Sequence, residues 1–157
     1  MKKVHFIGIG GIGISAIARF LKERDFIISG SDIADSAITK ELRASGMKIT
    51  VPHCKTAIED PDFVVYSAAI KGDNVELLEA RKRGIECLSR KEALPFILEG
   101  KRVFAVAGAH GKSTTSAMLA SLMEGSAIIG AISKEFGSNM KYEASDNLIF
   151  EADESDS

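Results

Sequence analysis

Two glycine-rich loops, each lying between an apolar run and a helical pattern, most constrain how this chain folds. The first loop follows the run at residues 4–7, and the second follows the run at residues 103–107. A helix that begins directly after such a loop leaves its first N–H groups without partners, and its dipole adds positive potential at the same place. That combination favours phosphate. The sequence therefore predicts two anion-binding turns.

Strand and helix patterns alternate along roughly the first hundred residues. Short β-branched or aromatic runs are separated by segments with helical spacing, and Gly46 and Gly84 close two of the expected helices. That alternation predicts a parallel sheet covered by helices, hence an α/β fold. Pro95 lies inside the last expected helix, where we expect a kink or an early turn. The expected strands are residues 4–7, 26–32, 47–50, 62–70 and 85–88.

The pattern restarts near residue 99. We therefore expect a Rossmann-like parallel-sheet domain over residues 1–99 and the start of a P-loop α/β ATP-binding domain over residues 100–157. The second unit offers only about three strands, fewer than such a domain needs to bury both faces of its sheet. We accordingly expect the chain to be a fragment of a longer protein. Its expected elements are a strand at 103–107, a helix at about 112–123, an apolar segment at 126–132 and a strand at 147–150.

The expected helix of the second unit carries a run of large apolar residues. Met118, Leu119, Leu122 and Met123 recur on one side of it. Helical spacing of this kind is typical of a face turned toward the core. We therefore expect these four side chains to be buried.

Composition excludes several classes of partner. The 157 residues include 20 basic and 22 acidic side chains, a formal net charge of −2. That balance gives no bulk attraction to nucleic acid or to an anionic membrane surface. No apolar run approaches the roughly 20 residues of a membrane helix. We expect a cytoplasmic protein with no nucleic-acid and no membrane partner, in which a local site holds any polyanion.

The second loop has the chemistry of an ATP site. Lys112 places a mobile positive charge for the β- and γ-phosphates, and the hydroxyl of Ser113 can ligate Mg²⁺. The usual motif has a further glycine where this chain has Val106, so the loop is a shorter form, G-x-x-G-K-S. Lys112 is also the predicted catalytic residue. The predicted ATP-binding residues are Gly108, Ala109, His110, Gly111, Lys112, Ser113 and Thr114.

An acidic cluster follows the last expected strand. In P-loop proteins the carboxyl end of such a strand faces the nucleotide, where a carboxylate helps to hold Mg²⁺. Glu151 is the first acid after the strand, so we predict Ser113 and Glu151 as metal ligands. Asp153 and Glu154 are assigned to solvent, because a run of charges is usually solvated.

The first loop predicts a diphosphate without identifying it. Gly8, Gly10 and Gly13 have the G-x-G-x-x-G spacing, and Asp32 ends the next strand. One interpretation is NAD with Asp32 on a ribose, but any nucleotide diphosphate meets the same geometry. An NAD dehydrogenase has no use for an adjoining ATP loop. An ATP-driven enzyme that acts on a nucleotide-linked substrate needs both loops.

Segments along nearly the whole chain resemble the Mur ligase family. The shortened G-x-x-G-K-S loop is itself the form found in that family, although the family usually has threonine where this chain has Ala109. The matching segments, in the order of the family, are HFIGIGGIGISAIA, SGSD, VPH, VVYSAAI, LSRKEAL, AVAGAHGKSTT and EADESD.

The resemblance implies an ATP-dependent amide ligase of peptidoglycan synthesis. Such an enzyme joins L-alanine to the carboxylate of UDP-N-acetylmuramate through an acyl phosphate, and Lys112 with Mg²⁺ would screen the repulsion between the reacting anions. The alternatives are a sister ligase that attaches a preformed peptide to the same carboxylate, and a non-catalytic dinucleotide-binding module. By matching position, the UDP-binding residues would be Gly8, Ile9, Gly10, Gly11, Ile12, Gly13, Asp32, His53, Ser67 and Ala68.

Overall fold

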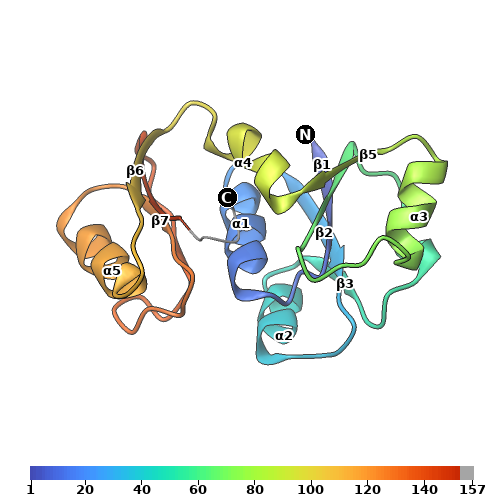
Figure 1. Cartoon of the computed structure of the whole chain (residues 1–157), viewed down its shortest axis with the longest axis horizontal. Helices are drawn as coiled ribbons and strands as arrows, with labels where there is room; N and C mark the ends of the chain where they lie inside the picture. The colour runs from blue at the N-terminus through green and yellow to red at the C-terminus, as the bar shows by residue number, and fades with distance from the viewer. Residues whose placement is uncertain (153–157) are drawn as a thin grey trace.

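The computed structural model describes residues 1–152, which form two sheets joined by residues 99–101 (Figure 1). The first sheet is entirely parallel, with strand order β3-β2-β1-β4-β5. Its strands are β1 (Lys3–Ile7), β2 (Ile27–Ser31), β3 (Lys48–Thr50), β4 (Phe63–Tyr66) and β5 (Glu86–Ser89). Its other elements are α1 (Ile12–Glu23), α2 (Ala37–Ala44), the 3-10 helix η1 (Lys55–Ala57), α3 (Val75–Lys82) and α4 (Arg90–Leu98).

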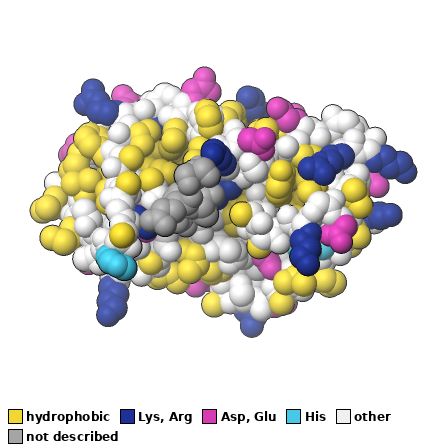
Figure 2. Space-filling view, in the orientation of Figure 1, with side chains coloured by type: hydrophobic (Ala, Val, Ile, Leu, Met, Phe, Trp, Pro, Cys, Tyr) yellow, Lys and Arg dark blue, Asp and Glu magenta, His cyan; other side chains and the backbone are white. Residues whose placement is uncertain are grey.

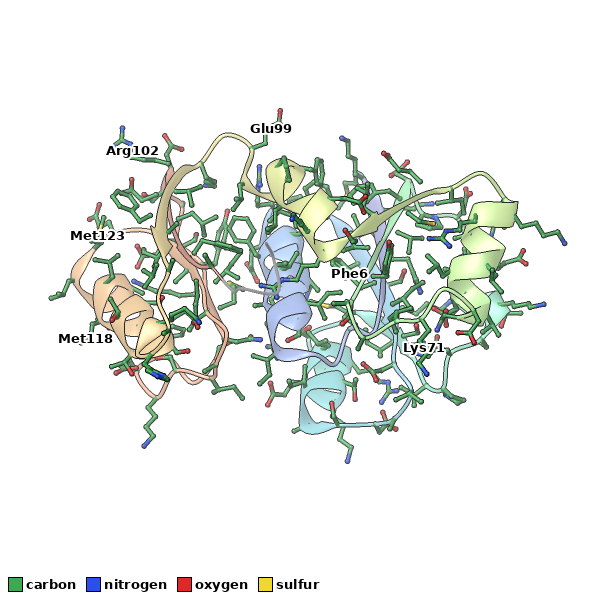
Figure 3. The ribbon with its side chains drawn as sticks, viewed as in Figure 1. Phe6, Lys71, Glu99, Arg102, Met118 and Met123 are labelled. Atoms are coloured by element: carbon green, nitrogen blue, oxygen red, sulfur yellow. The ribbon has the colours of Figure 1, made fainter. Side chains whose placement is uncertain are left out.

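The second sheet has strand order β6-β9-β7-β8. Its first three strands are parallel, and β8 pairs with β7 in the antiparallel direction. The connection from α4 runs between Glu99 and Arg102, both labelled in Figure 3, and it is there that we propose the domain boundary. The elements are β6 (Arg102–Val106), α5 (Lys112–Leu122), β7 (Ser126–Ile128), β8 (Met140–Lys141) and β9 (Asn147–Glu151).

The α/β fold and the parallel sheet predicted from the sequence are confirmed. The order of the first sheet is that of a doubly wound nucleotide-binding fold, in which the carboxyl ends of β1 and β4 flank the point where the chain reverses direction. Two local expectations differ. Pro95 does not mark a turn, because α4 continues through it to Leu98, and the alternative of a kink stays a prediction. The polar stretch before β9 contains β8, a two-residue strand too short to leave a pattern in the sequence.

The buried face of α5 is not the predicted one. Met118 is 58% exposed and Leu122 is 82% exposed, so these two side chains are not part of the core. Leu119 is partly buried against the core of the second sheet, and Met123 is half-buried. Figure 3 shows Met118 on the outer side of α5, and the face drawn in Figure 2 carries hydrophobic side chains over this part of the molecule. The helix instead buries the small residues Ser116, Ala117 and Ala120, which let it approach its sheet closely.

Helix α1 lies between the two sheets (Figure 1). One hydrophobic cluster contains α1 residues such as Ile14 together with Phe6 of β1 and Leu148 and Phe150 of β9. On the opposite face of the second sheet, Ile149 packs with residues of α5. Side chains of β9 therefore point alternately toward α1 and toward α5, because successive residues of a strand point to opposite faces of the sheet. No helix among residues 1–152 is long and apolar enough to cross a membrane.

Candidate functional site

The first cleft lies where strands of the first sheet end. Gly8 follows β1, Asp32 follows β2 and Ser67 follows β4, and all three line a cleft of about 650 Å³. Parallel strands bring their carboxyl ends to one edge, where such folds bind ligands. Gly10, Gly11 and His53, which the family resemblance assigns to one pocket, line the same cleft.

Asp32 is tied to the glycine loop. Its Oδ2 accepts the N–H of Gly10 at 2.7 Å, and its Oδ1 accepts the N–H of Ile33 at 2.7 Å. A Cβ at position 10 would lie 2.8 Å from Asp32 Oδ2, closer than non-bonded atoms approach. Glycine at this position is thus required by the close approach of the carboxylate, and the side chain of Asp32 is fixed at the cleft wall.

Several N–H groups of the first loop are used within the protein. Gly8 and Ile9 both donate to the carbonyl of Ser31, at 2.8 and 3.0 Å. The side chain of Ile9 is fully buried in the core, so this predicted UDP-binding residue lies outside the cleft. The N–H groups that the fold leaves for a ligand are those of the first turn of α1, where Gly11 is the N-cap and no side chain caps the helix.

A second groove begins at that turn. It has a volume of about 500 Å³, and the predicted residues Ile12, Gly13 and Ala68 line it. Gly11, Ser67 and Ala69 line both this groove and the first cleft, so the two are continuous. A ligand with a nucleoside in the first cleft can therefore extend past the N-terminus of α1.

Sequence reasoning missed Arg90 in this groove. A Cβ at Gly13 would lie 2.7 Å from Arg90 Nη1, so the guanidinium lies over the first turn of α1. Arg90 and Lys91 both line the groove and bring positive charge to it. The available signal was position: Arg90 directly follows β5, the strand beside β4, and so lies at the ligand-binding edge of the sheet.

Besides Ser36, the N-cap of α2, four polar residues at the first cleft were also missed. Arg43 donates to Asp35 Oδ1 at 2.6 Å, and this hydrogen bond lowers the pKa of the Asp35 carboxyl, which stays charged at the cleft. The loop between β4 and α3 contributes the others, and Figure 3 labels Lys71 on it. These residues follow strand ends and have no motif of their own. They are Asp35, Lys71, Asp73 and Asn74.

The phosphate loop forms a third cleft of about 340 Å³. Every predicted ATP-binding residue except Gly108 lines it, from Ala109 through Thr114, and Glu151 completes the wall. Gly111 is the N-cap of α5 with φ of 76°, a left-handed conformation that glycine adopts without strain. No side chain caps α5 either, so its first N–H groups face the loop.

The two predicted metal ligands meet at the base of this cleft. Ser113 Oγ donates to Glu151 Oε1 at 2.9 Å, while Oε2 of the same carboxylate accepts the N–H of Gly130 at 2.8 Å. A hydroxyl and a carboxylate are the hard oxygen ligands that Mg²⁺ prefers, with phosphate and water supplying the rest. The pair therefore fits a magnesium site, although residues 1–152 contain no group of three or more His, Cys, Asp or Glu side chains around one point. Asp153 and Glu154 lie outside the described residues.

A buried polar network lies beneath the first cleft. Glu76 is fully buried, and its carboxylate accepts from His5 Nε2 at 3.0 Å, from Ser31 Oγ at 2.5 Å and from the N–H of Cys54 at 2.8 Å. Burial by itself would raise the pKa of Glu76, but these hydrogen bonds hold it below its usual value. His5 is 1% exposed and therefore lies away from the cleft surface.

Sequence comparison places these clefts in a known family. A sequence model described as the Mur ligase family, catalytic domain, matches residues 3–102, more than half of the chain. The chain belongs to the Mur ligase family. Among curated relatives, UDP-N-acetylmuramate–L-alanine ligase of Campylobacter curvus is 76% identical over the whole chain, which covers 36% of the relative. The Helicobacter pylori (strain P12) ligase of the same name is 55% identical over 99% of the chain, covering 35% of its length.

Solved structures of this family have the same fold. UDP-N-acetylmuramate–alanine ligase of Thermotoga maritima superposes with a TM-score of 0.88 at 32% identity, over 99% of this chain and 38% of that one. The UDP-N-acetylmuramate:L-alanyl-γ-D-glutamyl-meso-diaminopimelate ligase of Neisseria meningitides gives 0.89 at 27% identity, over 98% and 53%. The chain thus spans a little over a third of the length of the curated relatives named above.

Proposed function

We propose that this chain supplies the UDP-binding domain and the ATP loop of a UDP-N-acetylmuramate–L-alanine ligase. The main observation is that one chain contains two sites. One is a nucleoside-sized cleft that leads to the N-terminus of α1. The other is a phosphate loop in which Lys112 adjoins the Ser113–Glu151 pair. Curated ligases of that name are 55–76% identical to it. Residues 1–99 and 100–157 would be the two domains.

In this proposal the substrate lies along the first sheet. The uridine occupies the first cleft near Asp32 and His53, and the diphosphate crosses Gly11 to the N-terminus of α1. Arg90 and Lys91 supply positive charge along that path. The helix dipole, the N–H groups at the start of α1 and the guanidinium all favour the same anion, and none of the described residues that line the second groove is acidic.

The phosphate loop would bind ATP. Lys112 and the first N–H groups of α5 stabilise negative charge on the transferring phosphoryl group. Ser113 and Glu151 would hold Mg²⁺, which when bound neutralises charge on the β- and γ-phosphates. Lys112 would thereby lower the repulsion between the muramyl carboxylate and the γ-phosphate that it attacks. L-Alanine then displaces phosphate from the acyl phosphate.

Calorimetry with the chain tests the first part of the proposal. We expect binding of UDP-N-acetylmuramate and of UDP, and weak or no binding of NAD. Because the relatives are nearly three times as long, we expect no amide formation by this chain alone. A tight NAD complex without UDP binding would instead support the dinucleotide-binding module.

The ATP site is tested separately. Lys112→Ala is expected to weaken binding of Mg-ATP by about tenfold or more, since it removes a charge-assisted contact to phosphate. Glu151→Gln is expected to reduce the dependence of ATP binding on Mg²⁺. Neither change should alter the affinity for UDP, because both residues line a different cleft. Unchanged ATP binding in both variants would refute the loop assignment.

The sister ligase remains the second candidate. The Neisseria ligase, whose name includes the tripeptide L-alanyl-γ-D-glutamyl-meso-diaminopimelate, matches the fold as well as the Thermotoga enzyme does. The high identities favour the L-alanine ligase. ATP-dependent phosphate release by the longer protein decides between them, because it would require L-alanine in one case and the peptide in the other.

A further inference from the structure

The network beneath the first cleft reaches the ring of His53 through Ser31. His53 lines the cleft, and its Nδ1 lies 2.8 Å from Ser31 Oγ. Ser31 Oγ in turn lies 2.5 Å from Oε2 of the buried Glu76. The distance from His53 Nδ1 to Glu76 Oε1 is 3.8 Å, too long for a direct hydrogen bond. Ser31 is therefore the only link between these two side chains within the described residues.

Counting protons along this link fixes its direction. A serine hydroxyl has one proton to donate, and its oxygen can accept others. A carboxylate only accepts, so the proton of Ser31 goes to Glu76. The oxygen of Ser31 must then accept from His53, which requires the proton of the ring to be on Nδ1.

The opposite direction would require a protonated Glu76. That carboxyl accepts from His5 and from the N–H of Cys54 as well as from Ser31, and three donors stabilise the charged form. These contacts keep the pKa of Glu76 below its usual value despite burial. Glu76 is thus a carboxylate at neutral pH. If the Ser31 hydroxyl donated to His53 instead, it would lose its hydrogen bond to this charged acceptor.

We propose that Glu76, acting through Ser31, holds neutral His53 in its Nδ1–H form, so that Nε2 is a hydrogen-bond acceptor for the uridine in the first cleft. The inference rests on the proposed function for the identity of the ligand. In it, Glu76 and Ser31 are positioning residues, and His53 is the residue that contacts the nucleoside. A histidine without this link would be free to adopt either tautomer.

An acceptor at this point selects a donor on the ligand. The uracil ring carries an imide N–H at N3, and the ribose carries hydroxyl protons. Cytosine has an unprotonated nitrogen at N3, which would face the lone pair of His53 Nε2. A site built to accept a hydrogen bond rejects an analogue that cannot donate one, because buried groups are then left unpaired.

The tautomer can be measured without any ligand. ¹⁵N NMR of histidine-labelled chain at about pH 8, where an ordinary imidazole is neutral, distinguishes protonated from unprotonated ring nitrogens. We expect His53 to show a protonated Nδ1 and an unprotonated Nε2. In Glu76→Gln, the amide can donate to Ser31, so the population should move toward the Nε2–H form. Glu79→Gln, which removes a charge from the same helix outside the network, should leave the wild-type pattern. An Nε2–H signal in the wild type would overturn the proposal.

Binding of nucleotide analogues tests the consequence. Where the base supplies the donor, wild-type chain should bind UDP at least about tenfold more tightly than CDP, and Glu76→Gln should lose most of that preference. Where the ribose supplies it, the same preference is expected for UDP over 2′-deoxy-UDP. N3-methyl-UDP and 2′-deoxy-UDP decide between base and ribose, because only the analogue that lacks the relevant donor binds weakly. Equal binding of all four nucleotides would refute the selection.

Two further results distinguish a failure of this inference from misfolding of a variant and from a failure of the proposed function. If Glu76→Gln fails to fold, Ser31→Ala breaks the same link while leaving the Glu76 charge in place, and it should abolish the single-tautomer pattern of His53. If the wild type binds no UDP, the proposed function fails. The ¹⁵N spectrum still decides the tautomer, and a mixed population there would sink the positioning role.

Discussion

Gly10 shows how a single missing methyl group shapes the first cleft. Its N–H reaches Asp32 only because no Cβ stands between them. The glycine spacing and Asp32 could be predicted from the sequence, since motif and strand end coincide. The N–H of Gly10 is used by Asp32, so the carboxylate and not a phosphate is the partner of this glycine, a detail that the spacing does not contain.

Gly10→Ala is expected to disable the cleft. The added Cβ would meet Asp32 Oδ2 at 2.8 Å and Thr39 Cγ2 at 3.2 Å, so the carboxylate must move and its hydrogen bond must lengthen. We expect a loss of about 1–3 kcal/mol in the free energy of unfolding and a weakened affinity for UDP. Urea denaturation and calorimetry measure the two effects. Gly72→Ala, where an added Cβ has no neighbour within 4 Å, is the control.

Glu76 could not have been assigned from the sequence. It lies in the first turn of α3, where a glutamate normally faces solvent and its negative charge interacts favourably with the helix dipole. Only the fold brings it beside His5, 71 positions earlier in the chain. Arg90 was missed for a related reason, because an arginine at a helix start is usually solvated. A sequence motif reveals the local backbone structure. It does not reveal contacts with residues distant in sequence, and the placement of these two side chains depends on such contacts.

The Glu76 carboxylate makes the free energy of unfolding depend on pH in the acid range. Its pKa is lower in the folded than in the unfolded chain, so the unfolded state binds more protons near pH 4. The stability that it contributes is complete above the ordinary glutamate pKa of about 4.3 and is lost as pH falls through the folded value. Between about pH 6 and 3, wild type should therefore lose more free energy of unfolding than Glu76→Gln does. Parallel slopes in the two proteins would contradict the expectation.

At the scale of elements, the helices divide by how they begin. Ser36 caps α2, Asn74 caps α3 and Ser89 caps α4, each through its side chain. The two helices that follow the glycine loops, α1 and α5, have glycine at the N-cap and no side-chain cap. The uncapped helices keep their N–H groups for a ligand. The two glycine loops were predicted from the sequence because they are local signals, whereas the three side-chain caps were not among the predictions.

Gly11→Asp should raise the stability of the protein and lower its affinity for UDP. Gly11 has φ of −66° and ψ of 144°, an extended conformation that suits a capping side chain, and the nearest atom to a new Cβ is Ile14 Cγ2 at 3.3 Å. We expect a gain of a few tenths to about 1 kcal/mol in stability and a loss of UDP affinity of about tenfold or more, because the carboxylate competes for the anion site. Gly11→Ala adds the same Cβ without the charge and should lower stability. Thermal melts and UDP titrations measure both, and unchanged UDP affinity in Gly11→Asp would argue against the anion site.

Strand and helix placement was predictable where packing follows pattern. Each strand of the first sheet overlaps an expected strand, so the sequence located all five. The pattern failed in part on α5, where the fully buried residues are small, Met118 and Leu122 are exposed, and only Leu119 of the large residues packs against the core. A close approach between helix and sheet selects small side chains, so the apolar stripe of a helix does not always mark the face that packs.

At the scale of the whole molecule, the two sheets share α1. Their joint core includes Phe6 from the first sheet and Leu148 from the second, with Ile14 between them. A polar tie supplements this packing: Asn139, 2% exposed, donates from Nδ2 to the carbonyl of Ile12 at 2.6 Å and to Ser15 Oγ at 2.8 Å. No sequence motif indicated this tie, which joins positions more than 120 residues apart.

Asn139→Ala should loosen the second sheet from α1 without affecting the first sheet. The change removes two hydrogen bonds and leaves the Ile12 carbonyl without this partner, at a cost of about 1–3 kcal/mol. Hydrogen exchange should then accelerate in β7, β8 and β9, while β1 and β4 keep their wild-type protection, because the first sheet retains its own helices. Asn147→Ala is the matched control: it removes one exposed bond within the second half, to the carbonyl of Glu124, and should change little. Equal acceleration in both sheets would mean that they open as one cooperative unit, and no acceleration would mean that apolar packing on α1 alone holds the second sheet in place.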